Sequence, residues 1–296
     1  MTRNERWETG VAIDYDKLMQ WPFPDVEQTY TARDTMLYAL GLGLGADPMD
    51  AAQLRYVYED GLVALPMMSV VLASPGFWVK DPATGVDWKK VLHGEQELVV
   101  HAALPVAATV IGRTRLDDII DKGEGKGAVA TSTRSITDKQ SGKLLAEVKS
   151  TSFWRGNGGF GGTPKPSPKP HAIPERAADI SHETKTLPQA ALIYRLSGDY
   201  NPLHADPAVA NTAGFARPIL HGLCTYGIAG HALIAKACAG DASRLKSLKV
   251  RFSSPVYPGE TVRTEIWNEG GGRHAVRARV VQRNIVVLDH GAALIG

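Results

Sequence analysis

The hydrophobic and polar positions of this chain run through two similar cycles. Each cycle opens with a helical stretch and continues with a second apolar segment, at 31–44 and 61–72 in the first half and at 187–196 and 219–237 in the second. Strand-like runs close each cycle, at 98–101, 108–119, 127–136 and 144–154, and again at 245–252, 261–267, 274–283 and 285–289. Turn signals such as Ser141-Gly142 and Pro258-Gly259 separate neighbouring runs, as antiparallel pairing requires.

The second apolar segment of the second half, 219–237, carries no charge until Lys236 and is rich in Ala, Gly and Leu. A helix that is apolar on every side belongs in a protein interior. Short antiparallel strands that follow such a helix indicate a sheet curled around it. The pattern therefore predicts an α+β fold.

A segment of different composition lies between the two cycles. Glycines dominate 156–162, and prolines alternate with other residues over 163–170. Glycine gives a chain freedom, and alternating prolines give an extended, semi-rigid spacer. We therefore expect a first domain at 1–155, a linker at 156–176 and a second domain at 177–296. The alternative is a long loop inside one domain.

A local match between the halves indicates duplication. Tyr38 begins the letters YALG and precedes ADP at 46–48, while Tyr194 begins YRLSG and precedes ADP at 205–207. The tyrosine and the aspartate are 9 residues apart in the first copy (47 − 38) and 12 apart in the second (206 − 194). The three extra residues of the second copy fall where its polar residues are concentrated.

Charge and cysteine content narrow the classes of function. Lys and Arg number 33 against 31 Asp and Glu, a formal net charge of +2 over 296 residues. A nucleic-acid partner that needs a broad basic surface is therefore not expected. Cys224 and Cys238 are the only cysteines, which excludes a cysteine zinc cage and a disulfide framework.

The sequence predicts no membrane partner and no targeting signal. The first residues lead into no apolar signal core, and the apolar run 218–235 is too short and too polar for a convincing membrane span. The chain ends Leu294-Ile295-Gly296 rather than in Ser-Lys-Leu. We expect a cytoplasmic protein.

The densest polar cluster in an apolar neighbourhood contains Asp199, Asn201 and His204. Pro202 disfavours helix at Asn201, so the chain turns and can bring the Asp199 and His204 side chains together. A carboxylate beside an imidazole can hold one water molecule and transfer its protons, and the Asn201 amide could orient that water. The alternative is a turn with solvated caps, because Asp, Asn and Pro are ordinary turn residues.

A second cluster follows at 217–222. Pro218 suits the first turn of a helix, and the next N–H groups, including that of Gly222, then have no helical partner. A substrate carbonyl could approach Gly222 closely and accept that bond, as in an oxyanion hole, although glycine in a buried helix also serves close packing. His221 could be a satisfied core histidine. A metal site from Asp199, His204, Asp206 and His221 is conceivable but is not expected, because their spacing matches no recognised ligand pattern.

The motifs resemble those of the MaoC-like enoyl-CoA hydratases. The letters YRLSGDYNPLHADP at 194–207 are similar to the hydratase 2 motif, and PILHGLCT at 218–225 is similar to the helix that follows it in that family. LHGEQE at 92–97 resembles a first-half segment of the two-domain hydratases 2, and VRFSSPVYPGE at 250–260 is also typical. The resemblance therefore touches both halves.

The resemblance implies a double hot-dog fold, in which two antiparallel sheets each wrap a central helix. It also implies reversible hydration of trans-2-enoyl-CoA to (3R)-3-hydroxyacyl-CoA, without metal or other cofactor. Asp199 and His204 match the catalytic pair, Asn201 the water-orienting residue and Gly222 the oxyanion-hole glycine. Tyr194, Glu95 and His221 are expected to bind substrate, and Lys249 and Arg251 are candidates for the CoA phosphates or, alternatively, plain surface charges.

The first half departs from the motif. GLGLG at 41–45 replaces the catalytic letters, and LPMM at 65–68 stands where Leu-His-Gly is expected. A half that loses its catalytic groups and becomes more apolar is free to accommodate an acyl chain, although simple divergence of a structural copy explains the same residues.

Two other functions fit the sequence: a related hydratase for a branched, dicarboxylic or steroid-side-chain acyl-CoA, and a non-catalytic acyl-CoA-binding subunit. Hot-dog domains commonly pair, and the two domains of this chain can pair with each other. A homodimer of the whole chain is a further expectation.

Overall fold

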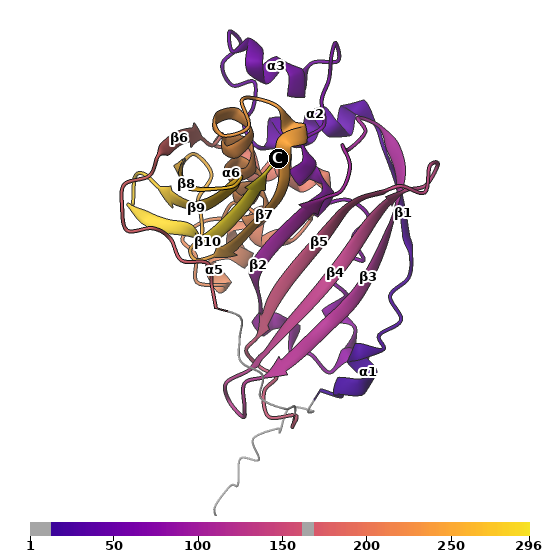
Figure 1. Ribbon diagram of the computed structural model, residues 1–296. Helices are drawn as coiled ribbons and strands as arrows, with labels where there is room; N and C mark the ends of the chain where they lie inside the picture. Colours follow the sequence, from indigo (N-terminus) through magenta and orange to yellow (C-terminus); the bar gives the residue numbers. More distant parts are fainter. Residues whose placement is uncertain (1–12, 162–168) are drawn as a thin grey trace, which may run out of the picture.

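The computed structural model describes residues 13–161 and 169–296, and its strands form one antiparallel sheet. The order across the sheet is β1-β3-β4-β5-β2-β7-β10-β9-β8-β6 (Figure 1). The two halves of this order are mirror images about the β2–β7 pair, so each half contributes five strands in the same arrangement. The strands are β1 Val26–Tyr30, β2 Val91–Val100, β3 Ala108–Asp121, β4 Ala128–Asp138, β5 Leu144–Trp154, β6 Ile180–Lys185, β7 Leu245–Phe252, β8 Thr261–Gly270, β9 Arg273–Val280 and β10 Ile285–Ile295.

This arrangement confirms the predicted α+β class and the double hot-dog. Prediction gave two separate sheets, whereas the structure has one. Strands β2 and β7 pair edge to edge and join the two halves, with Glu97 opposite Lys249. Prediction missed β1 and β6, which have only five and six residues and form the outer edges of the sheet. It also missed most of β2, finding only its end.

The helices are short except for one. They are α1 Tyr15–Met19, α2 Ala32–Gly41, α3 Ala51–Val57, α4 Ala190–Tyr194, α5 Pro207–Thr212 and α6 Gly222–Lys236, with 3-10 turns η1 Pro66–Val70, η2 Trp78–Lys80, η3 Pro82–Thr84, η4 Trp88–Lys90, η5 Arg195–Ser197, η6 Pro202–His204 and η7 Ala242–Arg244. Helix α6 is buried along most of its length, as its uniform apolar composition predicts.

The two halves differ at the position of the central helix. The second half has the 15-residue α6, whereas the first half has only the five-residue turn η1, which Pro66 opens. Within the described residues of the first half there is therefore no long central helix, contrary to the expectation of one helix per sheet. The two elements pack on each other: a Cβ on Gly230 of α6 would lie 2.6 Å from Cγ of the fully buried Met67.

The Gly-rich segment after β5 is fixed to the first half at its beginning. The carboxylate of Asp121 accepts hydrogen bonds from the N–H groups of Gly159 (2.8 Å) and Gly161 (2.9 Å). The Asn157 amide donates to the Gly85 carbonyl at 3.0 Å. Glycines here serve close backbone approach, since a Cβ on Gly158 would collide with the Gly123 carbonyl. The rest of the predicted linker includes 162–168, which lie outside the described residues.

In the part of the chain that the structure describes, no helix combines the length and the apolar character needed to cross a bilayer.

The contact between α6 and η1 gives a test of the fold. Gly230→Ala should lower the free energy of unfolding by about 1–3 kcal/mol, because the new methyl group overpacks Met67, although alanine favours a helix over glycine. Urea denaturation of Gly230→Ala, Met67→Ala and the double variant would measure this. In the Met67→Ala background the substitution should cost much less; an equal cost in both backgrounds would show that Met67 is not what the methyl group meets.

Candidate active site

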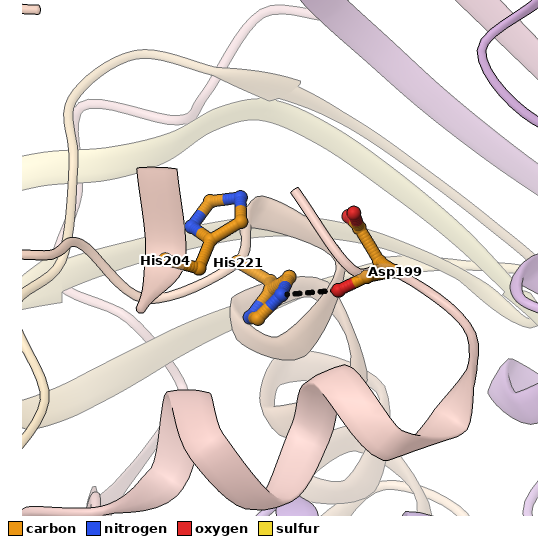
Figure 2. Close-up of side chains that lie close together, drawn as sticks. All are labelled: Asp199, His204 and His221. Carbon is orange, nitrogen blue, oxygen red and sulfur yellow. Dashed lines mark hydrogen bonds between the residues drawn. The ribbon is translucent and has the colours of Figure 1, made fainter. Parts of the chain in front are cut away.

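Three side chains of the predicted site lie together in the second half. Asp199, His204 and His221 each present a polar atom within 4.8 Å of the others (Figure 2). Asp199 follows η5, His204 closes η6, and His221 is the residue before α6. The structure thus brings together groups that are 22 residues apart in the chain.

The local sequence builds the turn that carries Asp199 and His204. Gly198 has φ of +123°, which a side chain rarely tolerates, and it leads the chain out of η5. The Asn201 side-chain oxygen accepts a hydrogen bond from the Leu203 N–H at 3.1 Å and so caps η6, with Pro202 in its first position. The Asn201 N–H donates to the Asp199 carboxylate at 3.2 Å. Asn201 therefore holds the turn in shape, and its water-orienting role stays a prediction.

His204 is buried and is oriented by the backbone. Its Nδ1 lies 2.9 Å from the Ile219 carbonyl oxygen. A carbonyl only accepts, so Nδ1 is the donor and the neutral ring keeps its lone pair on Nε2. Burial lowers the pKa of His204 below its ordinary value of 6.5, although the Ile219 bond and the Asp199 charge act in the other direction. At neutral pH the ring is therefore uncharged and able to accept a proton.

His221 is fully buried beneath His204. The two rings are 3.8 Å apart between centroids and inclined by 30°. The His221 Nε2–H donates to the main-chain oxygen of Asp199 at 3.1 Å (Figure 2). Burial, and then the nearby positive charge of a protonated His204, lower the pKa of His221 to about 4. The Tyr194 ring, also without exposed surface, packs 5.1 Å from His221 and supports it from the interior.

Gly222 is the first residue of α6 and is exposed. The His221 carbonyl accepts from the Thr225 N–H, so the Gly222 N–H precedes the donors of the helix ladder. A Cβ on Gly222 would lie 3.1 Å from the Phe252 ring. The absence of a side chain therefore leaves room beside this N–H, next to the positive end of the helix.

The first half also contributes to the site, through a residue that prediction missed. A β-bulge at Gly94 breaks the register of β2 between His93 and Glu95. The His93 ring lies 4.7 Å from the Phe252 ring, on the strand paired with β2. The His93 side chain keeps exposed surface. Partial desolvation lowers its pKa, and the backbone hydrogen bond at Glu95 and the Asp199 charge act in the other direction. The sequence signal that could have identified His93 is a histidine followed by a glycine at the start of a strand.

Glu95, Lys249 and Arg251 form an ion cluster between the halves. Glu95 on β2 meets Lys249 Nζ at 3.1 Å and Arg251 Nη2 at 2.6 Å, both on β7. Burial alone would raise the pKa of Glu95, but the hydrogen bonds from Arg251 and Lys249 hold it below its usual value. The cluster keeps one positive charge in excess and both cations stay partly exposed. Their predicted contact with phosphates stays a prediction.

The same three side chains are the ones that could hold a metal ion. Both His204 Nε2 and His221 Nδ1 carry a lone pair, and within the described residues no group lies in hydrogen-bonding distance of His221 Nδ1. The lone pairs lie in ring planes that are stacked and inclined by only 30°, so they run side by side rather than converge on one ion. The donor set suits a metal ion, but this arrangement of the lone pairs does not.

A recess of about 180 Å³ opens beside His204. Leu192 of α4, Arg217, Pro218 and Pro258 line it. It gives the His204 imidazole a route to solvent on the side of α4.

Comparison with known proteins identifies the family of both halves. Residues 170–289 match the MaoC like domain, and residues 28–156 match the MFE-2 hydratase 2 N-terminal domain. The 3-hydroxyacyl-thioester dehydratase Y of Mycobacterium tuberculosis is 42% identical, over 89% of this chain and 92% of that protein. The peroxisomal enoyl-CoA hydratase 2 of Arabidopsis thaliana is 39% identical, over 92% of this chain and 93% of that protein.

A solved structure shows the same architecture. The MaoC-like dehydratase of Phytophthora capsici superposes with a TM-score of 0.83 at 37% identity, covering 95% of this chain and 98% of that one. Fold and site define a hot-dog protein with its polar centre at the start of a buried helix. The chain belongs to the MaoC-like family, in the two-domain form that carries a hydratase 2 N-terminal domain.

The two stacked imidazoles should titrate separately. With ¹⁵N-labelled histidine, NMR should show His204 protonating below pH 6.5 and His221 near pH 4, because burial disfavours the charged ring and charge on His204 further disfavours charge on His221. At pH 7 the ¹⁵N chemical shifts of His204 should identify Nε2 as the unprotonated nitrogen. A His204 ring that is charged at pH 7 would contradict the geometry.

Proposed function

We propose that this protein is a hydro-lyase that adds water reversibly to a trans-2-enoyl-CoA and forms the (3R)-3-hydroxyacyl-CoA. The observation that supports this most directly is the position of Asp199 and neutral His204 beside the exposed first N–H of α6, at Gly222. Relatives named enoyl-CoA hydratase 2 and 3-hydroxyacyl-thioester dehydratase agree with it.

The chemistry follows from what hydration requires. The oxygen of water bonds to the β-carbon, one of its protons ends on the α-carbon, and the other stays in the new hydroxyl group. Asp199 and His204 hold this water: a neutral His204 Nε2 can take the proton, and the pair can return a proton to the α-carbon. Because all atoms of the added group come from one water molecule, addition occurs on the face of the substrate that the two side chains share.

Negative charge collects on the thioester oxygen while the water adds. The Gly222 N–H, at the start of the 15-residue α6, is placed to donate to that oxygen. The helix dipole adds to this effect within the first turn. His93 of the first half packs on Phe252 beside Gly222, so the first half borders the site without supplying its proton-transfer groups.

The first half is proposed to accommodate the acyl chain. It has the five-residue η1 where the second half has α6, and the side chains of Met67 and Met68 are buried there. Methionine adapts to irregular apolar space, as a flexible chain requires.

Lys249 and Arg251 are proposed to bind the CoA phosphates. Glu95 neutralises only one of their two positive charges, so one positive charge is left for the phosphates. A cytoplasmic location, a homodimer and the lack of nucleic-acid or membrane partners stay predictions.

The reaction and its two proton-transfer residues can be tested together. Loss of the enoyl-thioester absorbance would be followed with crotonyl-CoA, and the chirality of the product would be determined. Asp199→Asn and His204→Gln should each lower kcat/KM by about 10²–10⁴-fold, because each removes a proton-transfer group.

Asp206→Asn is the matched control for this experiment. Asp206 lies in the same motif but caps α5, a role that asparagine also fills, so activity should be retained. Folded wild type with no turnover on crotonyl-CoA or a longer enoyl-CoA would reject the proposal in favour of a binding subunit. Formation of the (3S) alcohol would reject the proposed face of addition.

Chain-length selectivity tests the role of the first half. Met68→Phe should lower kcat/KM for a ten-carbon enoyl-CoA several-fold more than for crotonyl-CoA, because the larger ring takes space that only the longer chain would use. Crotonyl-CoA is the internal control for folding. Equal effects on both substrates would indicate that this half is a diverged structural copy.

A further inference from the structure

A cavity of about 500 Å³ lies at the opposite end of the β2–β7 pair from the catalytic residues. His93 and Phe252 mark the catalytic end, where β2 starts and β7 finishes. Val100 and Lys246 line the cavity, where β2 finishes and β7 starts. The two strands are antiparallel and pair through Glu97 and Lys249, so the two sites flank the centre of the sheet.

The internal symmetry of the fold relates these two places. The strand order is the same in both halves about the β2–β7 pair, so exchanging the halves exchanges the two ends of that pair. The catalytic site lies where α6 begins after Leu220 and His221. The cavity lies where η1 begins, and the turn's first residue Pro66 is part of its wall. The cavity is therefore the first half's counterpart of the catalytic site.

The cavity has apolar and positively charged lining residues but no counterpart of the Asp199–His204 pair. Ala64, Pro66 and Leu104 are buried and give it apolar walls, whereas Arg55 and Lys246 bring positive charge to its exposed side. The one carboxylate in the lining, that of Asp241, accepts a hydrogen bond from the Ser243 N–H and caps η7. Apolar walls with cations at one side suit a ligand with an apolar chain and an anionic end.

We propose that this cavity binds a medium-chain carboxylate, a fatty-acid anion, as a ligand that the enzyme does not convert. The choice of an acyl ligand rests on the proposed function, through the symmetry with the acyl-CoA site. The ligand is not the tail of the substrate bound at Gly222. Helix α6 alone separates the two ends by about 22 Å.

Decanoate is the probe, and calorimetry with the full chain measures its binding. Wild type should bind one decanoate per chain, and should still bind it when an excess of decanoyl-CoA, which is saturated and cannot be hydrated, occupies the catalytic site. Lys246→Glu should weaken decanoate binding about tenfold or more by reversing a charge at the carboxylate, and Ala103→Trp should abolish it by filling the cavity.

Lys143→Glu is the matched control, because Lys143 is an exposed lysine on the β4–β5 turn and has no place in the cavity. It should leave decanoate binding unchanged. Crotonyl-CoA turnover reports separately on folding and should stay at the wild-type level in all three variants. An enzyme that binds decanoate but hydrates no enoyl-CoA would reject the proposed function and keep this site.

Three results would overturn the proposal. They are no binding of decanoate to wild type, complete displacement of decanoate by decanoyl-CoA, and binding that is unchanged in both Lys246→Glu and Ala103→Trp. The second would place decanoate in the catalytic site, and the third would place it elsewhere on the surface.

Discussion

The pairing of β2 with β7 is the constraint on which the rest of this molecule depends. Five residue pairs, from Glu95–Arg251 to Val99–Ser247, turn two five-stranded sheets into one continuous sheet. The pairing sets His93 of one half against Phe252 of the other, beside Gly222 at the start of α6. The Glu95 ion cluster lies on the same two strands, so electrostatic and backbone contacts fix the same register. The contact of His93 with Phe252 therefore needs both halves.

Within this frame the halves have taken different roles. The second half keeps the long helix and the polar turn, whose shape depends on Gly198 and Pro202. The first half has given up both and supplies walls instead. A duplicated fold allows this division, because the proposed chemistry requires only one set of proton-transfer groups.

The strongest local signals in the sequence were reliable, and the long-range ones were not. The helix at α6 was predictable because its residues are apolar on every side, and the turn at Asp199 because proline and glycine leave few backbone alternatives. Roughly the whole of β5 and β7 followed from their strand-like runs. His93 was missed because a bulge at Gly94 directs it, and a bulge depends on the partner strand. Tyr194 could be named but not placed, since its full burial arises from contacts with Tyr38 and His221.

The stacking of His204 on His221 also limits how many protons the centre can store. Two imidazolium rings with centroids 3.8 Å apart would repel strongly in a buried site, so the pair holds at most one extra proton near neutral pH. Hydration neither consumes nor releases protons overall, and a store of one is enough to pass a proton from water to carbon. Under the proposed mechanism, each turnover can therefore finish without a buffer molecule entering to carry charge in or out.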